Sequence, residues 1–339
     1  MKRLAKIFSF FLTAALSVSC ASYKQPSANL YRELEPEPVP VRLDYQRYPV
    51  DRLGPELSPR CGNLSLAAER LSRDAGYLSS AVCAGRGTGT RGAVEASAYI
   101  FKRMKEEGLT PSYQTFNCGG TVCRNVIAEI PGMLERPLVV MAYYDGIGIG
   151  PDGYYPGADS NASAVAALLE LGSRLSGGGK YKVVIAALDA HSISMAGAAQ
   201  LCERYSRPSP ALVVNLDILG STLSPVFKLC PDYLLCLGGE RYSTALYAAN
   251  NSGPGLHLSF DYYGSANFTR LFYRSVSDQR FFLERGVPCL MFTSGISFNT
   301  NRLSDTFETL DFEILSRRVD LIGIFLENFQ YISALKIQR

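Results

Sequence analysis

The chain lacks several features that mark other classes of protein. Its 34 basic and 31 acidic residues leave a net charge of only +3, and no block of like charge occurs along the sequence. This balance gives no reason to expect nucleic acid as a partner. No Cys-x-x-Cys pair is present, so a cysteine-based zinc site is not indicated. Histidine is scarce, because His191 and His257 are the only two.

Size and composition predict one globular domain with additional N-terminal sequence. The chain has 339 residues, of which 47% are hydrophobic and 19% are charged. Such a composition is able to bury a full core, and single domains extend to roughly 250 to 300 residues. We therefore expect the folded domain to occupy residues 61–339.

The first twenty residues have the layout of a secretory signal. Basic residues precede an apolar stretch over residues 7–18, which is too short to span a bilayer. The segment 17–20, SVSC, resembles the lipobox of bacterial lipoproteins, in which cleavage precedes a cysteine that becomes acylated. The resemblance implies a lipid on Cys20 and a place at the bacterial cell envelope, anchored to a membrane and facing the periplasm or exterior.

This lipobox departs from the usual pattern at one place. The leucine that normally stands three residues before the cysteine is absent, and Leu16 stands one place further back. The alternative is a soluble secreted protein that the ordinary signal peptidase cuts.

Residues 21–60 are predicted to form a tether between the lipid and the domain. Prolines among charged residues favour extended, weakly packed chain over a core element. The prolines of this segment are Pro26, Pro36, Pro38, Pro40, Pro49, Pro55 and Pro59.

Eight cysteines remain when Cys20 is set aside, an even number that suits disulfides in an oxidising compartment. Two pairs are close enough in sequence to suggest local disulfides, namely Cys118 with Cys123 and Cys230 with Cys236. The sequence leaves the pairing of the other four open. These are Cys61, Cys83, Cys202 and Cys289.

Helical and strand patterns alternate from about residue 62 onward. Strands are predicted at 125–130, 137–143, 181–188, 211–216 and 287–292. Helices are predicted at 93–107, 162–175, 195–205, 241–250 and 312–332. Near-continuous apolar strands that alternate with helices are typical of an α/β fold, with a mostly parallel central sheet flanked by helices.

Polar residues follow the predicted strands directly. Asp145 follows strand 137–143, Asp217 follows strand 211–216, and Asp189, His191 and Ser192 follow strand 181–188. Chemistry in such sheets gathers beyond the carboxyl ends of the strands. We expect these side chains to share one rim.

Several ordered segments resemble the di-zinc aminopeptidase family, which also contains glutaminyl cyclases. Residues 157–170, GADSNASAVAALLE, look like the start of the family's signature helix. Residues 125–132, NVIAEIPG, resemble an early strand of its sheet. Ser277-Asp278 with the later Gly-Val-Pro, and the Ser-Asp-Thr at 304–306, resemble its late joins. The resemblance covers roughly residues 62–335 and implies an aminopeptidase-like (phosphorylase/hydrolase-like) fold.

In that family two zinc ions are held by two histidines, two aspartates and a glutamate. A second glutamate, beside the ligand glutamate, activates the bridging water. Zinc requires carboxylate oxygens or neutral imidazole nitrogens, and a metal-bound water needs a nearby base to become a nucleophile.

The resemblance places other residue types at most of these positions. The first histidine falls on Tyr143, although its companion Asp145, next to the site, is kept. The bridging aspartate falls on Ser160 and the ligand glutamate on Ser192. The last histidine falls on Asn301.

Two positions keep groups with acid–base or ligand chemistry. His191 stands at the general-base position, and Asp217 is the one retained ligand position. Hydroxyl and carboxamide groups are poor zinc ligands, and even the loss of supporting contacts weakens metal binding roughly ten- to a hundred-fold. We therefore expect no cofactor and an exported binding or scaffolding pseudopeptidase, whose cleft takes a peptide or protein.

Two enzymatic alternatives remain open. In the first, His191 and Asp217 hold one metal together with Asp145 or Asp159, and the protein hydrolyses peptides as a zinc-dependent exopeptidase. In the second, a serine acts with His191 and Asp217 as a metal-free triad. No Gly-x-Ser-x-Gly elbow surrounds Ser160 or Ser192. A structural role for Asp217, at the end of its strand, is a further interpretation.

Overall fold

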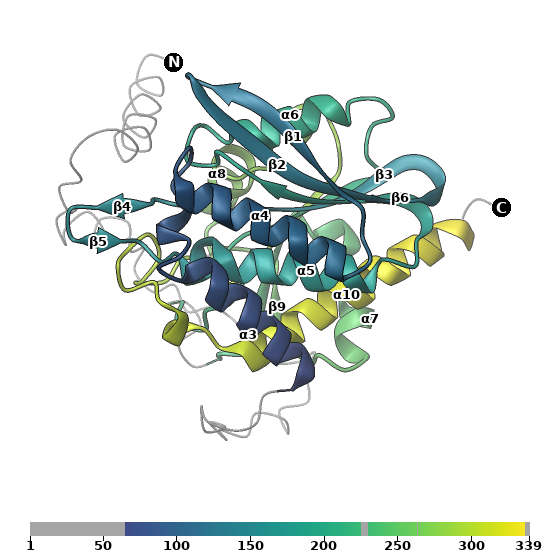
Figure 1. Cartoon of the computed structure of the whole chain (residues 1–339). Coiled ribbons are helices and arrows are strands. Elements are labelled where there is room, and N and C mark those ends of the chain that lie inside the picture. The colour runs from purple at the N-terminus through teal and green to yellow at the C-terminus, as the bar shows by residue number, and fades with distance from the viewer. Residues whose placement is uncertain (1–64, 225–229, 263, 336–339) are drawn as a thin grey trace, which may run out of the picture. The chain divides into compact units, whose positions relative to one another are not determined.

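A computed structural model describes residues 65–224, 230–262 and 264–335 (Figure 1). The predicted signal segment 1–20, with Cys20, and the tether 21–60 lie outside the described residues, as does Cys61. Within the described ranges, no helix combines the length and apolar character needed to cross a membrane.

An eight-stranded mixed sheet organises the described part of the chain. Its order is β1-β2-β6-β3-β7-β10-β8-β9. The central strands β6, β3, β7 and β10 are parallel, whereas β1 and β2 at one side and β8 beside β10 pair antiparallel. A separate two-stranded sheet consists of β4 (Ile149–Gly150) and β5 (Gly153–Tyr154). The strands of the main sheet are β1 (Pro111–Cys118), β2 (Thr121–Ile130), β3 (Gly132–Tyr143), β6 (Gly179–Leu188), β7 (Leu212–Leu216), β8 (Tyr233–Leu237), β9 (His257–Ser259) and β10 (Cys289–Thr293). The predicted α/β fold class with a mostly parallel sheet is confirmed.

The central strands are apolar because both of their faces are covered. In β3, Val139 and Met141 belong to the core on one face, whereas Leu138, Val140 and Ala142 belong to the core on the other. All five are fully buried. Side chains alternate across a strand, so a run of apolar residues without polar interruptions marks a strand buried on both sides.

The larger core lies under five helices and the smaller core under two. Figure 1 shows α3, α4 and α5 side by side across one face of the sheet, with α10 beside them. On the opposite face α6 and α9 cover the smaller core, and α8 packs on a third cluster near β8. The helices are α3 (Leu66–Ser79), α4 (Arg91–Glu106), α5 (Ala164–Arg174), α6 (Ala196–Arg204), α7 (Ser243–Asn251), α8 (Ala266–Ser275), α9 (Arg280–Glu284) and α10 (Phe312–Leu335).

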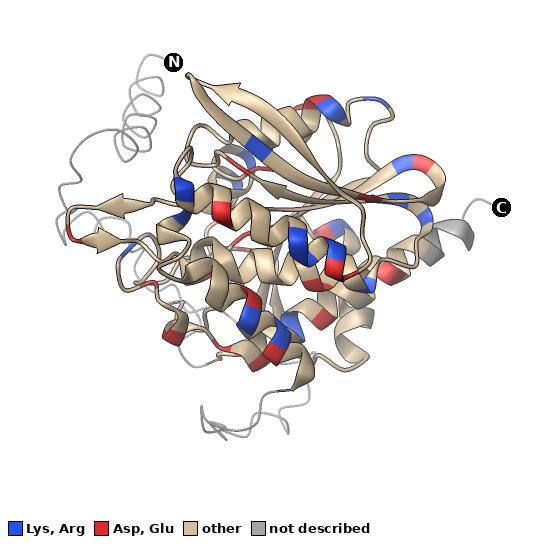
Figure 2. Cartoon of the chain, viewed as in Figure 1, with Lys and Arg blue, Asp and Glu red and all other residues tan. Residues whose placement is uncertain are grey.

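The charged residues on the helix face are interleaved, as Figure 2 shows for α3 and α4. Several form ion pairs between neighbouring helices. Arg70 of α3 pairs with Glu170 of α5, and Arg174 of α5 pairs with Glu327 of α10. Partly exposed pairs of this kind contribute little individually. They indicate an ordinary solvated surface on this face.

Each predicted strand and helix corresponds to an element of the structure, although β2 and β3 begin several residues earlier than predicted. The sequence analysis did not predict β1, β8, β9 or the helices α3, α8 and α9. β1 escaped prediction because it is an edge strand with mostly polar, exposed side chains. β8 is a five-residue apolar run, which has no periodicity of its own to identify it.

Both predicted local disulfides are wrong. Cys118 pairs across the hairpin with Thr121 and Cys123 pairs with Phe116, so the two cysteines are offset along the ladder. Cys236 is buried within β8, while the Cys230 thiol contacts Asp232. All cysteines in the described residues carry free thiols.

Candidate functional site

The polar residues predicted to share a rim do lie at one edge of the sheet. Strands β3, β6, β7 and β10 run parallel, so the loops that follow them leave from the same edge. These loops carry Asp145, His191 with Ser192, Asp217 and Asp305, respectively. The prediction that these loops share one edge of the sheet is therefore confirmed. What the site is able to do depends on the partners of each side chain.

His191 is held by a buried carboxylate that sequence reasoning did not assign to the site. Its Nδ1 lies 2.8 Å from Oδ2 of Asp278, and the Asp278 side chain is fully buried. The imidazole also stacks on the Tyr143 ring, with centroids 3.8 Å apart and planes 13° apart. The His191 side chain keeps 26% of its surface exposed. The one feature of the sequence that could have identified Asp278 as a site residue was its place in the family-like Ser-Asp pair at 277–278.

The carboxylates around His191 set its charge. Burial lowers the pKa of His191, but the charge of Asp278 and its hydrogen bond, together with Asp145 and Asp217, outweigh burial and raise that pKa to about 9. His191 is therefore an imidazolium at neutral pH. Burial raises the pKa of Asp217 to about 6, with His191 and the Tyr143 hydroxyl acting in the opposite direction.

Asp145 organises the turn that follows β6. Its Oδ1 accepts a hydrogen bond from the His191 backbone N–H at 2.8 Å. Its Oδ2 accepts bonds from the Ser192 N–H at 3.1 Å, the Ser192 hydroxyl at 2.9 Å and the Thr88 hydroxyl at 3.0 Å. The carboxylate, only 1% exposed, is thus occupied by donors from the protein itself.

Ser160 belongs to a second buried cluster. Its hydroxyl donates to Oδ2 of Asp305 at 2.7 Å, and its backbone N–H donates to the same oxygen at 3.1 Å. Burial and the nearby Asp305 charge raise the pKa of Asp159 to about 7. Oδ1 of Asp159 accepts the Gly220 N–H at 2.7 Å, while its Oδ2 is buried without a partner.

Two fully buried arginines fasten the rim loops, and sequence reasoning missed both. Arg86 donates to the carbonyls of Tyr144, Pro156 and Gly157 at 2.8 to 2.9 Å, and also to Leu78. Arg318 of α10 donates to the carbonyls of Leu219, Ser221 and Tyr233. Burial lowers the pKa of each guanidinium. Each arginine ties loops that are distant in sequence to the core.

The structure brings only some of the predicted site residues together. Tyr143, His191 and Asp217 form one group, which Asp278 completes. Ser192 is turned to Asp145, and Ser160 is turned to Asp305. Asn301 lies on an exposed part of the loop after β10, with φ 61°.

These donors do not suit a zinc centre. Zinc sites need three or more nitrogen, sulfur or carboxylate ligands directed at one point. Among residues 65–224, 230–262 and 264–335, no three His, Cys, Asp or Glu side chains are grouped so that they could hold a metal. The Nδ1 atom of His191 and the carboxylate of Asp145 are already engaged with protein partners.

The metal-free triad is not assembled either. Each serine hydroxyl bonds to an aspartate rather than to an imidazole, and the acidic partner of His191 is Asp278 instead of Asp217. A triad requires the nucleophile within hydrogen-bond reach of the base. This alternative is wrong for the geometry present.

The sheet order defines an α/β protein whose fold is that of known aminopeptidases and glutaminyl cyclases. BSAP, a zinc aminopeptidase from Bacillus subtilis, matches with a TM-score of 0.65 at 13% identity, over 79% of this chain and 96% of that one. A glutaminyl cyclase from Fimbriiglobus ruber matches with a TM-score of 0.64 at 16% identity, over 79% and 97%. LapA aminopeptidase from Legionella pneumophila gives 0.63 at 15%, over 78% and 72%.

The family follows from sequence. The profile of peptidase family M28 matches residues 125–323, which is more than half of the chain, so the protein belongs to peptidase family M28. The structural matches are too distant in sequence to show more than the fold. No curated protein matched the chain.

The His191–Asp278 pair predicts a pH-dependent stability. The pKa of His191 is about 9 in the folded protein and 6.5 as the ordinary value, so the pair stabilises the fold fully below pH 6.5 and ceases to do so as the pH rises to 9. Chemical denaturation of metal-free protein should show His191→Gln losing on the order of 1 to 3 kcal/mol at pH 6, and much less at pH 9.5.

Two further variants test whether the pH dependence of stability comes from the His191–Asp278 pair rather than from any change of charge. Asp278→Asn should remove the same pH dependence, whereas Asp152→Asn, at an exposed turn beside β5, should retain it. A wild-type slope between pH 6.5 and 9 in Asp278→Asn would contradict the assignment.

Proposed function

We propose that this M28 domain lacks metal-dependent catalysis and serves as a peptide- or protein-binding module at the cell envelope. The observation that carries the proposal is the set of partners at the former ligand positions. Ser160 bonds Asp305, Ser192 bonds Asp145, and Tyr143 stacks on His191. A zinc ion would have to displace these contacts, and at these three positions it would gain only neutral hydroxyl oxygens in return.

The remaining donors support the same view. Asp217 is the one carboxylate left at a ligand position, and burial raises its pKa to about 6 although the charge of His191 lowers it. His191 is charged at neutral pH, and an imidazolium offers no lone pair to a metal. In the alternative, His191 and Asp217 hold a single metal ion in a remodelled site. His191 would then have to lose its imidazolium proton before it could bind that ion.

A binding role is supported by apolar side chains around the rim. The loops after β3, β6, β7 and β10 expose large apolar residues, although surface loops are commonly polar. Isolated exposed apolar residues are ordinary, whereas several of them on loops that leave the same edge of the sheet favour a binding role for that edge. The residues are Ile147, Ile149, Ile193, Leu223, Phe298 and Leu303.

The first test is metal content together with restoration of the ligands. Purified protein dialysed with trace zinc should contain close to no metal per chain by plasma mass spectrometry, and should not hydrolyse leucine p-nitroanilide. A variant carrying Tyr143→His, Ser160→Asp, His191→Glu, Ser192→Glu and Asn301→His should gain zinc, because carboxylate and imidazole ligands return to the rim.

Two metals per wild-type chain with chelator-sensitive hydrolysis would overturn the proposal. One metal, lost in both His191→Gln and Asp217→Asn, would favour the remodelled mononuclear peptidase.

The apolar rim gives a second prediction. Fluorescein-labelled 12-residue peptides that alternate leucine or phenylalanine with serine should bind the protein without being cut. The double variant Ile149→Ser, Phe298→Ser should weaken binding at least about five-fold, because both side chains are 73% exposed and are available to a ligand. Met133→Ser is the control, since Met133 is 86% exposed at the start of β3, at the opposite edge. Equal loss in the control, or no binding by wild type, would exclude the rim as the binding site.

Attachment to the membrane is a separate part of the proposal, supported by the sequence around Cys20. Cells expressing the full chain and fed an alkyne fatty acid should incorporate label into the protein, and Cys20→Ser should release unlabelled protein from the membrane fraction. Label retained in Cys20→Ser would contradict acylation at this residue. Unlabelled wild-type protein in the soluble fraction would favour the ordinary signal peptidase.

A further inference from the structure

The strand β1 leaves one edge of the sheet open. It is the outermost strand in the sheet order, and Figure 1 shows it along the border of the sheet. All of its residues pair with β2 in an unbroken antiparallel register, so within the described residues no strand lies on its other side. Alternate backbone N–H and carbonyl groups of such an edge strand point away from the sheet and are available to another chain.

The strand β1 also lacks the features that usually protect an edge. Proteins prevent the pairing of edge strands with charged side chains, with proline inside the strand, with bulges, or by keeping the strand short. The sequence of β1, PSYQTFNC, contains eight residues and no charge, and its one proline stands at the first position. Its register with β2 contains no bulge. This edge is therefore able to pair with a further strand.

Two stacked aromatic rings lie beside this edge, on the side of the sheet that α4 covers. The Tyr113 ring of β1 and the Phe101 ring of α4 have centroids 4.8 Å apart and planes 25° apart, and Tyr113 remains 39% exposed. The Lys105 Nζ lies 5.2 Å from the centroid of the Phe101 ring. The Arg124 Cζ lies 5.3 Å from the centroid of the Tyr113 ring. Two positive charges are thus held against apolar surface next to the open strand.

Both of these cations lack an acidic partner. Among the residues that the structure describes, none forms an ion pair with the side chain of Lys105 or Arg124. The glutamates at the end of α4 are engaged by Arg103, which pairs with Glu106 at 2.7 Å and with Glu107 at 2.8 Å. Uncompensated positive charge beside an open strand favours an acidic ligand. A second copy of this chain would instead bring the same cations against each other.

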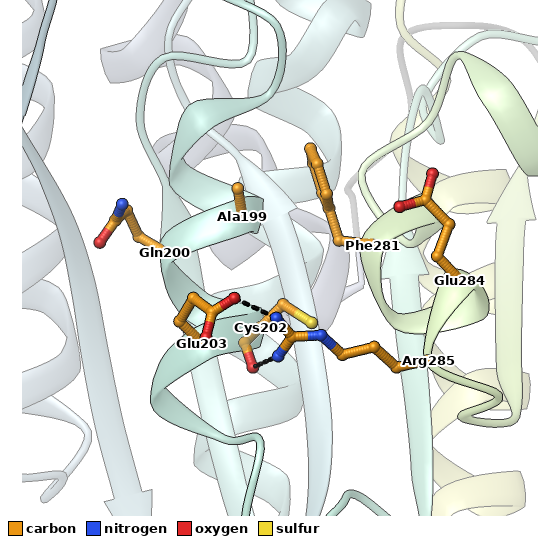
Figure 3. A pocket seen from close by; sticks show the side chains of 7 residues that line it. All are labelled: Ala199, Gln200, Cys202, Glu203, Phe281, Glu284 and Arg285. Atoms are coloured by element: carbon orange, nitrogen blue, oxygen red, sulfur yellow. Dashed lines mark hydrogen bonds and ion pairs between the residues drawn. The ribbon is translucent and has the colours of Figure 1, made fainter.

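The cavity between α6 and α9, of about 330 Å³, is less suited to an acidic ligand (Figure 3). Two carboxylates, Glu203 and Glu284, line it together with a single cation, Arg285. As the dashed lines show, Arg285 donates to the Cys202 carbonyl at 3.0 Å and pairs with Glu203. That guanidinium is already used within the protein, whereas the two cations beside β1 are not.

We propose that the open edge of β1 binds an extended acidic segment of a partner protein, which adds a further strand to the sheet. The segment lies about 4.8 Å from β1 and forms backbone hydrogen bonds with it. Every second side chain of the segment is acidic and faces Lys105 and Arg124, because alternate side chains of a strand lie on the same face. The positions between them face the α6 side, where Gln114 of β1 is neutral and donates to the Gln200 carbonyl. No residue of the rim takes part.

The test uses a fluorescein-labelled peptide that has the length of β1 and alternates glutamate with threonine. Fluorescence anisotropy at low salt should show binding to the purified protein, and added salt should weaken that binding because it screens the charges. The matched peptide that alternates lysine with threonine should not bind. No binding of the glutamate peptide at millimolar concentration, or equal binding of both peptides, would overturn the proposal.

Hydrogen exchange tests whether the backbone of β1 takes part. Binding of the glutamate peptide should slow amide exchange in residues 111–118, because their outward N–H groups gain acceptors. Exchange in β9, at the opposite edge of the sheet, should not change. Binding without added protection in β1 would mean attraction by charge alone, and the proposed strand would then be wrong.

Paired variants test the role of the two cations. Lys105→Gln combined with Arg124→Gln should weaken binding of the glutamate peptide at least about five-fold at low salt, because both charges are lost. The control combines Lys180→Gln with Arg241→Gln, a lysine and an arginine that also lie over tyrosine rings but belong to β6 and to the turn before α7. Equal losses in the two double variants, or no loss in the first, would contradict the assignment.

Two further measurements distinguish other occupants and sites. A dimer in sedimentation velocity without peptide, dissociated by Tyr113→Lys, would assign the edge to a second copy of the chain instead of an acidic partner. The rim variant Ile149→Ser, Phe298→Ser should bind the glutamate peptide as the wild type does. Loss of binding in that variant would place the peptide at the rim and would refute the site at β1, whereas failure of the rim proposal leaves this test unchanged.

Discussion

The arrangement of this protein depends on the burial of four parallel strands, β6, β3, β7 and β10, on both faces. Parallel strands must be joined by crossovers that cover the sheet, so helices occupy both sides and the following loops gather at one edge. The polar side chains of these loops, which would be costly to bury in the apolar core, therefore lie at that edge. Buried Arg86 and Arg318 then fix the loops through backbone carbonyls.

Several carboxylates end up in a confined space beside cationic side chains of the protein itself. His191 is placed against Asp278 and is influenced by Asp145 and Asp217. In the second cluster the charge of Arg318 acts on Asp159, and the charge of Arg86 acts on Asp305. In the proposed function these internal cations take the place that metal charge has in zinc members of the M28 family. Tyr143, Ser160 and Ser192 complete the rim with neutral groups.

The edge of the sheet beyond the parallel strands carries the proposed binding role. The edge beyond the parallel strands combines buried charge with exposed Ile149 and Phe298, which suits recognition of apolar segments.

The amino-acid sequence alone determined the fold class, the central strands and the loops of the site. Continuous apolar runs such as 137–143 require burial on both sides, and the ordered M28-like segments fix the chain order. The strand β1 was not recognised because an edge strand is only partly buried and lacks a clear apolar pattern. Local disulfides were predicted because the number of residues between two cysteines does not give their register in a hairpin. Only the tertiary structure decided that Asp278 holds His191, and that Ser160 and Ser192 turn to different aspartates. Such partners are distant along the chain, so packing alone determines which side chains meet.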